Sequence, residues 1–385
     1  MAKQNICIIG GGLTGLITAI TLSKLNFKVD LITEKFNKKV KQSNRTSAIS
    51  QSAFNFLKKL NFLKITKKNF WPCSNMKLYV DQKKNKFEEI FDMDKDKKLK
   101  KNIFYMMNNS ALIEQMLKYV KKNKYINFKS GSKISTINDL DFLKEIKLKN
   151  NKNLKYNLVI ICTGSNSNLS KTIFGNNYFR HSYKEISATT IIQHIPNKNN
   201  SARQIFLDNE IIALLPISEN KTSIVYTAKS QIINYYKNKT SLKKRIIFFT
   251  KDFYKKTKIV SKVEFRNLNL LIRKKYYQER TILFGDALHE VHPFVGQGFN
   301  MTLRDLMSLE NTLRKKINLG LDVGTSNILL EFSNKVKPRN FLFSLGIDFM
   351  KNCFSYQKQT FKNLRNEIII KLNKNTFIKN IFFDI

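Results

Sequence analysis

The sequence has few cysteines, and this scarcity narrows the class of protein. Only four occur among 385 residues, at positions 7, 73, 162 and 353. They show no Cys-x-x-Cys spacing, so neither a zinc site nor a disulfide framework is indicated, and a reducing compartment fits. We therefore expect a cytoplasmic protein without a metal site.

Acidic residues are also scarce. The chain has 28 Asp and Glu against 69 Lys and Arg, a formal net charge of +41. A field of this sign favours an anionic partner, such as nucleic acid, an anionic membrane or an acidic protein. The plainer interpretation is that Lys, Asn, Ile and Phe are enriched together, as an A+T-rich genome would produce, and that most lysines lie on solvated faces. We expect no nucleic-acid partner, because no recognition-helix or RNP-like motif occurs and the basic residues are spread throughout.

The sequence lacks a long apolar run that is free of glycine. The uncharged residues 4–23 could pass for a membrane anchor by length alone. Four glycines interrupt their middle, where each costs up to about 1 kcal/mol in a helix. We therefore predict no transmembrane span. With 42% hydrophobic and 12% aromatic residues, the chain should still fold, as two domains or one large α/β unit.

The N-terminal residues show a strand, turn, helix, strand pattern. The apolar run 5–9 is typical of a buried parallel strand, and residues 28–33 form a second one. Between them lies Gly10-x-Gly12-x-x-Gly15, followed by apolar residues at helical spacing. In a dinucleotide fingerprint the first glycine makes a tight turn, the second lets the backbone approach a pyrophosphate, and the third lets helix and strand pack closely. The helix start, with Leu13 and Thr14, would offer N–H groups to the phosphates. The alternative is a glycine-rich turn without a ligand.

A ribose-binding carboxylate is expected roughly twenty residues further along, at the end of the second strand. Glu34 lies nineteen residues after Gly15 and is the candidate. The alternative is a surface charge beside Lys35.

The rest of the chain changes character twice. Residues 158–162 and 281–284 are typical of buried strands, and residues 110–120 and 299–314 have helical periodicity. Residues 94–101 and 144–155 indicate exposed turns or hairpins. Between about residues 179 and 273, short β-rich runs at 188–194, 203–207, 211–215 and 222–227 predict an antiparallel sheet from a different domain.

The most specific signal is a late motif. It reads Gly285-Asp286-Ala287-Leu288-His289-Glu290-Val291-His292-Pro293-Phe294-Val295-Gly296-Gln297-Gly298-Phe299-Asn300, with Asp305 following. It resembles the pattern GDAAHxxHPxxGQGxNxGxxD of the flavin-dependent aromatic hydroxylases, most closely those of ubiquinone biosynthesis. Leu288 and Thr302 are departures. A metal pair is improbable, since His289 and His292 have no obvious third ligand.

The resemblance implies roles for individual residues. Asp286 would bind a hydroxyl of FAD, and Arg45, in Arg45-Thr46-Ser47-Ala48, would contact the cofactor. His292 and Pro293 would lie at the flavin edge, although no catalytic residue can be named. Further cofactor contacts are implied for the turn and helix start formed by Gly296, Gln297, Gly298 and Asn300, whose N–H groups would face the flavin and stabilise its reduced, negative form.

The resemblance also implies a fold similar to p-hydroxybenzoate hydroxylase. Its parts would be a Rossmann-like FAD-binding domain, an inserted antiparallel β-sheet substrate domain and a helical C-terminus. The corresponding boundaries are 1–72, 98–177 and 274–330 for the FAD-binding domain, 73–97 and 178–273 for the substrate domain, and 331–385 for the C-terminal segment.

Two departures from the family pattern bear on the cofactor. A second fingerprint, usually Gly-Ala-Asp-Gly-x-x-Ser-x-x-Arg, has Thr163 in place of its aspartate and Ser170 in place of its arginine. The pyrophosphate and nicotinamide contacts that this motif implies are therefore open here. Aligned without a gap, the family's ribose glutamate falls on Thr33 rather than Glu34.

The implied reaction is hydroxylation of a polyprenylated phenol or quinol by O2, through a C4a-hydroperoxide of reduced FAD, with NAD(P)H or a ferredoxin as electron donor. Because such a substrate lives in a bilayer, the positive charge could bind an anionic leaflet or a biosynthetic complex, as a peripheral protein on the inner membrane face. Residues 340–354 and 375–385 are candidates for an interfacial contact, unless they pack against the flavin domain. The alternatives are a reductase or halogenase of the same fold and a non-catalytic FAD-binding scaffold.

Overall fold

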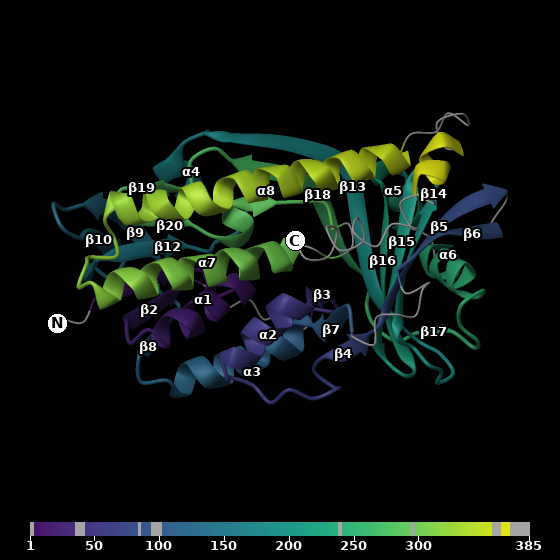
Figure 1. Cartoon of the computed structure of the whole chain (residues 1–385), viewed down its shortest axis with the longest axis horizontal. Helices are drawn as coiled ribbons and strands as arrows, with labels where there is room; N and C mark the ends of the chain where they lie inside the picture. The colour runs from purple at the N-terminus through teal and green to yellow at the C-terminus, as the bar shows by residue number, and fades with distance from the viewer. Residues whose placement is uncertain are drawn as a thin grey trace.

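A computed structural model describes residues 4–34, 43–83, 86–93, 102–237, 241–293, 296, 298–355 and 363–369. Two large sheets organise these residues, one in each half of an elongated molecule (Figure 1). The C-terminal helix α8 (Ser326–Ser355) runs along both halves.

The first sheet is six-stranded and mainly parallel. Its strand order is β19 (Tyr277–Gln278), β20 (Thr281–Leu283), β12 (Leu158–Ile161), β1 (Asn5–Ile9), β2 (Lys28–Thr33) and β8 (Ile126–Ser130). Only β19 is antiparallel to its neighbour. All four residues of β12 are buried, as expected of a strand covered on both faces. The predicted Rossmann-like sheet, with β1 at its centre, is confirmed.

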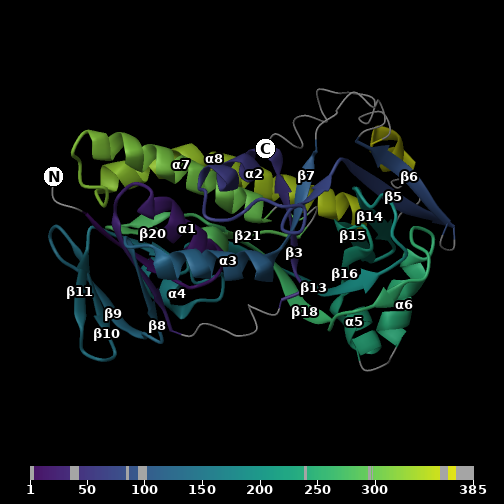
Figure 2. The same cartoon turned by 90° about the horizontal axis from the view of Figure 1, so that it is seen from below.

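Helices cover this sheet and connect its strands. They are α1 (Leu13–Ser23), α2 (Gln51–Lys59), α3 (Asn109–Lys122), α4 (Asn168–Phe174) and α7 (Gly298–Asn318). Helix α1 is buried from Gly15 to its end, because α3 and α7 pack against it (Figure 2). Ser50 caps α2 and Asn108 caps α3, each accepting backbone N–H hydrogen bonds.

The second sheet forms the other half. Its strand order is β21 (His289–Glu290), β18 (Glu264–Arg273), β13 (Tyr178–Gln193), β16 (Lys221–Lys229), β15 (Glu210–Ser218), β14 (Ser201–Leu207), β5 (Asn75–Lys83) and β6 (Lys86–Asp92), and β17 (Lys258–Ile259) pairs with β13. The predicted antiparallel sheet is present, and β5 and β14 are its one parallel pair among the described strands. Strand β5 comes from an early segment of the chain and joins the sheet beside β14 without a hairpin connection.

Two three-stranded sheets complete the β structure. One contains β3 (Thr46–Ser50), β7 (Phe104–Asn108) and β4 (Trp71–Cys73), and the other contains β9 (Ile134–Asp139), β10 (Lys144–Leu148) and β11 (Asn153–Tyr156). The hairpin expected at 144–155 is therefore present as β10 and β11. The expected turn at 94–101 lies outside the described residues.

The remaining helices lie mainly in the second half. They are α5 (Ser230–Lys237), α6 (Ser241–Thr250), the 3-10 turn η2 (Gly285–Ala287) and a helix at 363–369. Helix α8 joins the halves: Phe332 packs against Phe284 of the first, while the ring of Phe354 lies 3.7 Å from that of Phe206 on β14. Since α8 starts at Ser326, it crosses the predicted boundary at 331; the other domain boundaries stay predictions. None of the described helices is both long and apolar enough to cross a membrane.

Candidate functional site

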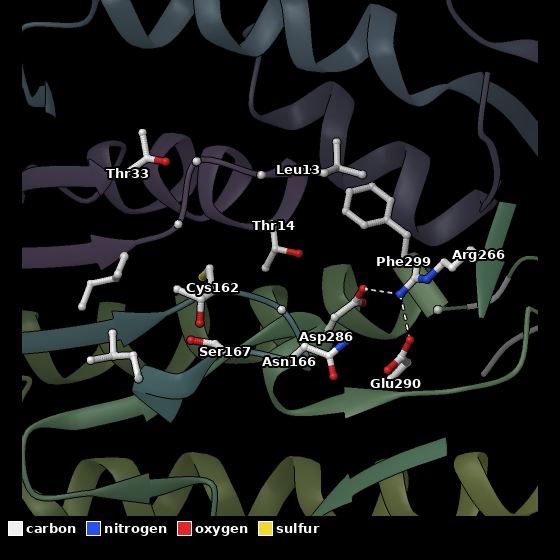
Figure 3. Close-up of a pocket in the computed structure, with 18 of the residues that line it drawn as sticks. Leu13, Thr14, Thr33, Cys162, Asn166, Ser167, Arg266, Asp286, Glu290 and Phe299 are labelled. Atoms are coloured by element: carbon white, nitrogen blue, oxygen red, sulfur yellow. Dashed lines mark hydrogen bonds and ion pairs between the residues drawn. The ribbon is translucent and has the colours of Figure 1, made fainter. Parts of the chain in front are cut away.

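A cavity of about 1600 Å³ lies between the two large sheets. Its wall combines the loop after β1, the end of β2, the loop after β12, strand β18 and the residues between η2 and α7 (Figure 3). Small-molecule pockets usually measure roughly 300–1,000 Å³. A cavity of this size suits an extended ligand such as a dinucleotide with room for a second molecule.

The glycine loop forms one end of the cavity. Gly10 has φ of +120°, and a Cβ there would lie 2.5 Å from the carbonyl oxygen of Cys162, so only glycine fits. A Cβ on Gly15 would lie 1.8 Å from the carbonyl oxygen of Gly10, which confirms its packing role. Gly12 differs, because a Cβ there would meet nothing within 4 Å. Gly10 and Gly12 line the cavity, as do Leu13 and Thr14 at the start of α1.

The start of helix α1 faces this end of the cavity. Gly12 is its N-cap residue, and no side chain caps its first N–H groups. A helix N-terminus carries a partial positive charge and binds phosphates well. The geometry therefore suits a pyrophosphate beside Gly12, as the motif predicts.

Thr33 and Glu34 both lie on the cavity wall. Thr33 is buried and packs over Gly11 (Figure 3). The carboxylate of Glu34 is 55% exposed and pairs with Lys133 at 3.0 Å. Either side chain is placed to contact a ribose, so the role of Glu34 stays a prediction.

The second fingerprint follows β12 and also reaches the cavity. Thr163 and Gly164 line it, and Gly164 has φ of +82°, a conformation that favours glycine. The buried hydroxyl of Thr163 has no hydrogen-bond partner among the described residues. It is therefore available to a ligand, although it cannot supply the negative charge of the family's aspartate.

An arginine from another strand contacts Ser170, which stands at the arginine position of this fingerprint, but it is not among the cavity-lining residues. Arg273 of β18 is 1% exposed and its guanidinium donates to the Ser170 hydroxyl at 3.3 Å. It also donates to the carbonyls of Gly175 and Ala287 and lies over the ring of Tyr178. Burial lowers its pKa. Sequence comparison of the motif alone could not find this arginine, because it comes from about a hundred residues away.

Asp286 lies on the cavity wall beside a charged cluster. Arg266 of β18 contacts Asp286 at 3.3 Å and Glu290 at 2.9 Å (Figure 3). Burial alone would lower the pKa of Arg266, but the two carboxylates raise it. Arg45 also lines the cavity, and burial together with the nearby Arg266 lowers its pKa. Asp286 and Arg45 thus both lie on the cavity wall, and their contacts with a cofactor stay predictions. Arg266 and Glu290 were missed because nothing local marks them.

Several residues of the late motif lie beside the cavity and hold its wall. Asn300 accepts from the backbone N–H of Ser50 and donates to the carbonyl of Ala48. Asn300 is not among the cavity-lining residues, and its side chain holds β3. Its contact with the cofactor stays a prediction. His289 contacts Asp305 at 3.0 Å, and Asn340 of α8 donates to the same carboxylate at 2.7 Å. No three His, Cys, Asp or Glu side chains of the described residues gather as a metal site requires.

The two flavin-edge candidates point to different places. Pro293 lines the cavity, but the side chain of His292 is 2% exposed and lies 3.3 Å from Glu185 of β13. Lys351 of α8 contacts the other oxygen of Glu185 at 3.0 Å. Burial lowers the pKa of His292 more than Glu185 raises it, so the imidazole is neutral at pH 7. The side chain of His292 therefore contacts β13 and does not line the cavity.

A small, mostly apolar recess lies next to the cavity beside Pro293. It measures about 60 Å³ and shares Thr46, Val225, Pro293 and Gly296 with the cavity. Its other lining residues include Met76, Phe104, Met106, Gln204 and Leu215. Gly296 and Gly298 also line the main cavity, whereas Gln297 lies outside the described residues. The recess places an apolar space directly beside the loop that the motif assigns to the flavin.

Comparison with protein families and curated proteins gives consistent matches. A family described as "FAD binding domain" matches residues 3–320. The ubiquinone biosynthesis monooxygenase COQ6 of Dictyostelium discoideum is 24% identical, over 99% of this chain and 90% of that protein. The 3-demethoxyubiquinol 3-hydroxylase of Escherichia coli K12 is 23% identical, over 94% of this chain and 93% of that protein.

Solved structures share the fold. p-Nitrophenol 4-monooxygenase PnpA from Pseudomonas putida DLL-E4 has a TM-score of 0.80 at 15% identity, covering 99% of this chain and 96% of that one. Klebsiella pneumoniae HpxO, solved with FAD and uric acid, has a TM-score of 0.75 at 13% identity, covering 98% of this chain and 95% of that one. The predicted fold class is confirmed by these neighbours.

Proposed function

The chain belongs to the FAD-binding-domain family, and from this premise we propose that it is a monooxygenase that hydroxylates the ring of a polyprenylated phenol in ubiquinone biosynthesis. The observation that carries the proposal is full-length similarity to relatives of one activity. The match covers at least 80% of the length of three relatives from different organisms, which are named as a ubiquinone biosynthesis monooxygenase, a ubiquinone hydroxylase and a 3-demethoxyubiquinol 3-hydroxylase.

The residues at the cavity fit FAD. Open space faces Gly12, the N-terminus of α1 is uncapped by side chains, and the Thr163 hydroxyl lacks a partner among the described residues. We assign the pyrophosphate to Gly10, Gly12, Leu13 and Thr14, the ribose to Glu34, and the flavin side to Arg45, Asp286, Gly296 and Gly298. When bound, FAD supplies the activation of O2 and the transfer of one oxygen atom to the ring.

The protein itself positions the reacting groups and excludes water from them. Helix α7 starts at Gly298 beside the turn, so its first N–H groups can stabilise negative charge on a ring held there. The neutral His292 and its partner Glu185 hold this loop from the buried side. The recess beside Pro293 offers an apolar place for the aromatic ring of the phenol.

We further propose that α8 contacts the membrane from which the substrate comes. Phe341, Leu342, Leu345 and Phe349 project from its exposed side, with Phe349 67% exposed. Lys335, Lys337 and Arg339 are exposed one or two turns before them. Aromatic and aliphatic residues beside basic ones are typical of a helix that lies on an anionic bilayer.

The membrane proposal is tested by sedimentation with vesicles. Leu342→Ser with Phe349→Ser should weaken binding to phosphatidylglycerol vesicles, while Phe142→Ser, at an equally exposed phenylalanine on the β9–β10 hairpin, should not. Equal binding of both variants would contradict a contact through α8.

The catalytic proposal is tested with purified protein loaded with FAD. The reduced protein should convert a short-tailed prenylphenol and O2 into a product that is heavier by one oxygen atom, as measured by mass spectrometry. NADH, NADPH and a reduced ferredoxin are compared as electron donors. A protein that binds FAD and phenol but forms no hydroxylated product with any donor would contradict the proposal.

A further inference from the structure

The recess is mostly apolar, but Gln204, Thr46 and Arg203 also line it, and Gln204 is the one that lies within the apolar cluster. On β14, Ala202, Gln204 and Phe206 alternate onto the same face of the sheet, and Ala202 and Phe206 belong to an apolar cluster with Met76 and Leu215. Gln204 lies between them, opposite Leu78 of β5 and Ala213 of β15. It is only 3% exposed and lines the recess.

The carboxamide oxygen of Gln204 is buried without a hydrogen-bond partner among the described residues. Buried polar groups are nearly always paired, because an unpaired one loses its bonds to water and gains nothing in return. A glutamine also loses more side-chain entropy on burial than an aliphatic residue. This position therefore carries a polar oxygen at a cost to stability that no hydrogen bond from the described residues offsets.

A second polar atom lies at the mouth of the same recess. Thr46 lines both the recess and the main cavity, and its buried hydroxyl has no hydrogen-bond partner among the residues described. Between the two side chains the wall is apolar, formed by residues such as Met106, Val225 and Pro293. An aromatic ring that carries a hydroxyl group matches this arrangement of apolar wall and isolated polar groups.

We propose that Gln204 is a specificity-determining residue that hydrogen-bonds a hydroxyl group on the substrate ring and so sets which ring edge faces the flavin loop. The inference rests on the proposed function. A phenol hydroxyl donates to Oε1, and the carboxamide of a glutamine can also donate from Nε2, so it can satisfy both roles of a hydroxyl. The recess measures about 60 Å³, well below the roughly 300 Å³ or more of a pocket that holds a whole small molecule. It therefore admits the hydroxylated edge of the ring, while the rest of the ring lies in the main cavity.

The geometry predicts that one substitution weakens the binding of a phenol and does not lower the stability of the protein. Gln204→Met keeps the length of the side chain and removes its polar end. Binding of a phenol should weaken about tenfold, because a hydrogen bond in a dry site is lost. The melting temperature of the protein without FAD or phenol should be equal to or above that of the wild type, because an unpaired buried group has been removed. A merely structural glutamine would instead lower the melting temperature.

The experiment titrates the FAD-loaded protein with two ligands, a short-tailed prenylphenol and the matching prenylbenzene that lacks the hydroxyl group. Binding is followed by the change in flavin absorbance. The wild type should bind the phenol about tenfold more tightly than the arene, and Gln204→Met should lose most of this preference while binding the arene at least as well. Gln193→Met, at an exposed glutamine of β13 in the same sheet, is the matched control and should keep the preference. Gln204→Leu serves as a second variant.

Three outcomes would overturn the inference. The preference for the phenol could survive in both Gln204 variants, or both variants could melt well below the wild type. A wild-type protein that binds FAD but neither ligand would contradict the proposed function itself, and the role of Gln204 would be lost with it.

Discussion

The two ends of the cavity are assembled in different ways. At the end near β1, a single short loop supplies Gly10 and Gly12, and its backbone forms the wall. At the end near the recess, side chains come from β3, β14, β18 and the loop before α7, which are far apart in the sequence. The first end depends on local backbone geometry and the second on tertiary pairing, so a sequence motif describes the first well and the second poorly.

The largest expected effect tests the first end. Gly15→Ala should destabilise the protein by about 3 kcal/mol or more, because its Cβ would collide with the backbone carbonyl of Gly10. Gly12→Ala should change the free energy of unfolding by less than about 1 kcal/mol, because open space surrounds it. Its FAD affinity should nevertheless fall about tenfold or more. Urea unfolding and FAD titration measure the two quantities. Equal losses of stability in both variants would show that the glycines do not divide into packing and binding roles.

A smaller effect tests the tertiary pairing at the second end. Arg266→Gln should cost about 1–3 kcal/mol, because the buried carboxylate of Glu290 loses its cation. This is less than the cost of breaking a fully buried pair, since Arg266 is 37% exposed. Arg180→Gln, at an exposed arginine that donates to Asn166, is the control and should change the free energy of unfolding by less than about 0.5 kcal/mol. Equal losses of unfolding free energy in the two variants would show that the ion pairs of Arg266 stabilise the protein no more than the exposed contact of Arg180 does.

Sequence reasoning succeeded where the determinant is local. The strands around Gly10 and the start of α7 followed from apolar runs and glycine positions, and the likeness to the hydroxylases followed from one continuous motif. It could not find Arg273, which contacts Ser170 from another strand. It also could not find that the side chain of Asn300 holds β3, and the assignment of this residue to the cofactor stays a prediction. A sequence pattern gives the residue type at each position, but it does not give the neighbour that the side chain contacts in the fold.

The buried His292 gives the second end a pH dependence. Burial lowers the pKa of His292 below its ordinary value. As the pH falls below about 6.5, the imidazole is therefore protonated more readily in the unfolded chain than in the folded one, and the folded state loses stability. Burial alone would raise the pKa of Glu185, but contacts with His292 and Lys351 lower it, so its contribution is lost in a separate window below about pH 4.5. Within the window of His292, just below pH 6.5, the slope should be at most about 1.4 kcal/mol per pH unit.

Thermal unfolding between pH 7.5 and 5 measures this slope. His292→Gln should flatten it, and His181→Gln, at an exposed histidine of β13, should follow the wild type. An unchanged slope in His292→Gln would mean that other groups set the acid sensitivity of this loop.

The smallest effect decides between Thr33 and Glu34 at the first end. Because the carboxylate of Glu34 is 55% exposed and pairs only with a surface lysine, Glu34→Gln should leave the free energy of unfolding within about 0.5 kcal/mol of the wild type. If this carboxylate binds a ribose hydroxyl, FAD affinity should still fall about tenfold, because a hydrogen bond to a charged group is lost. Thr33→Val removes a hydroxyl from a buried side chain that packs over Gly11, so it should alter stability more than FAD affinity. The reverse result, with FAD binding sensitive to Thr33→Val and not to Glu34→Gln, would shift the ribose contact by one residue and make the family alignment correct without a gap.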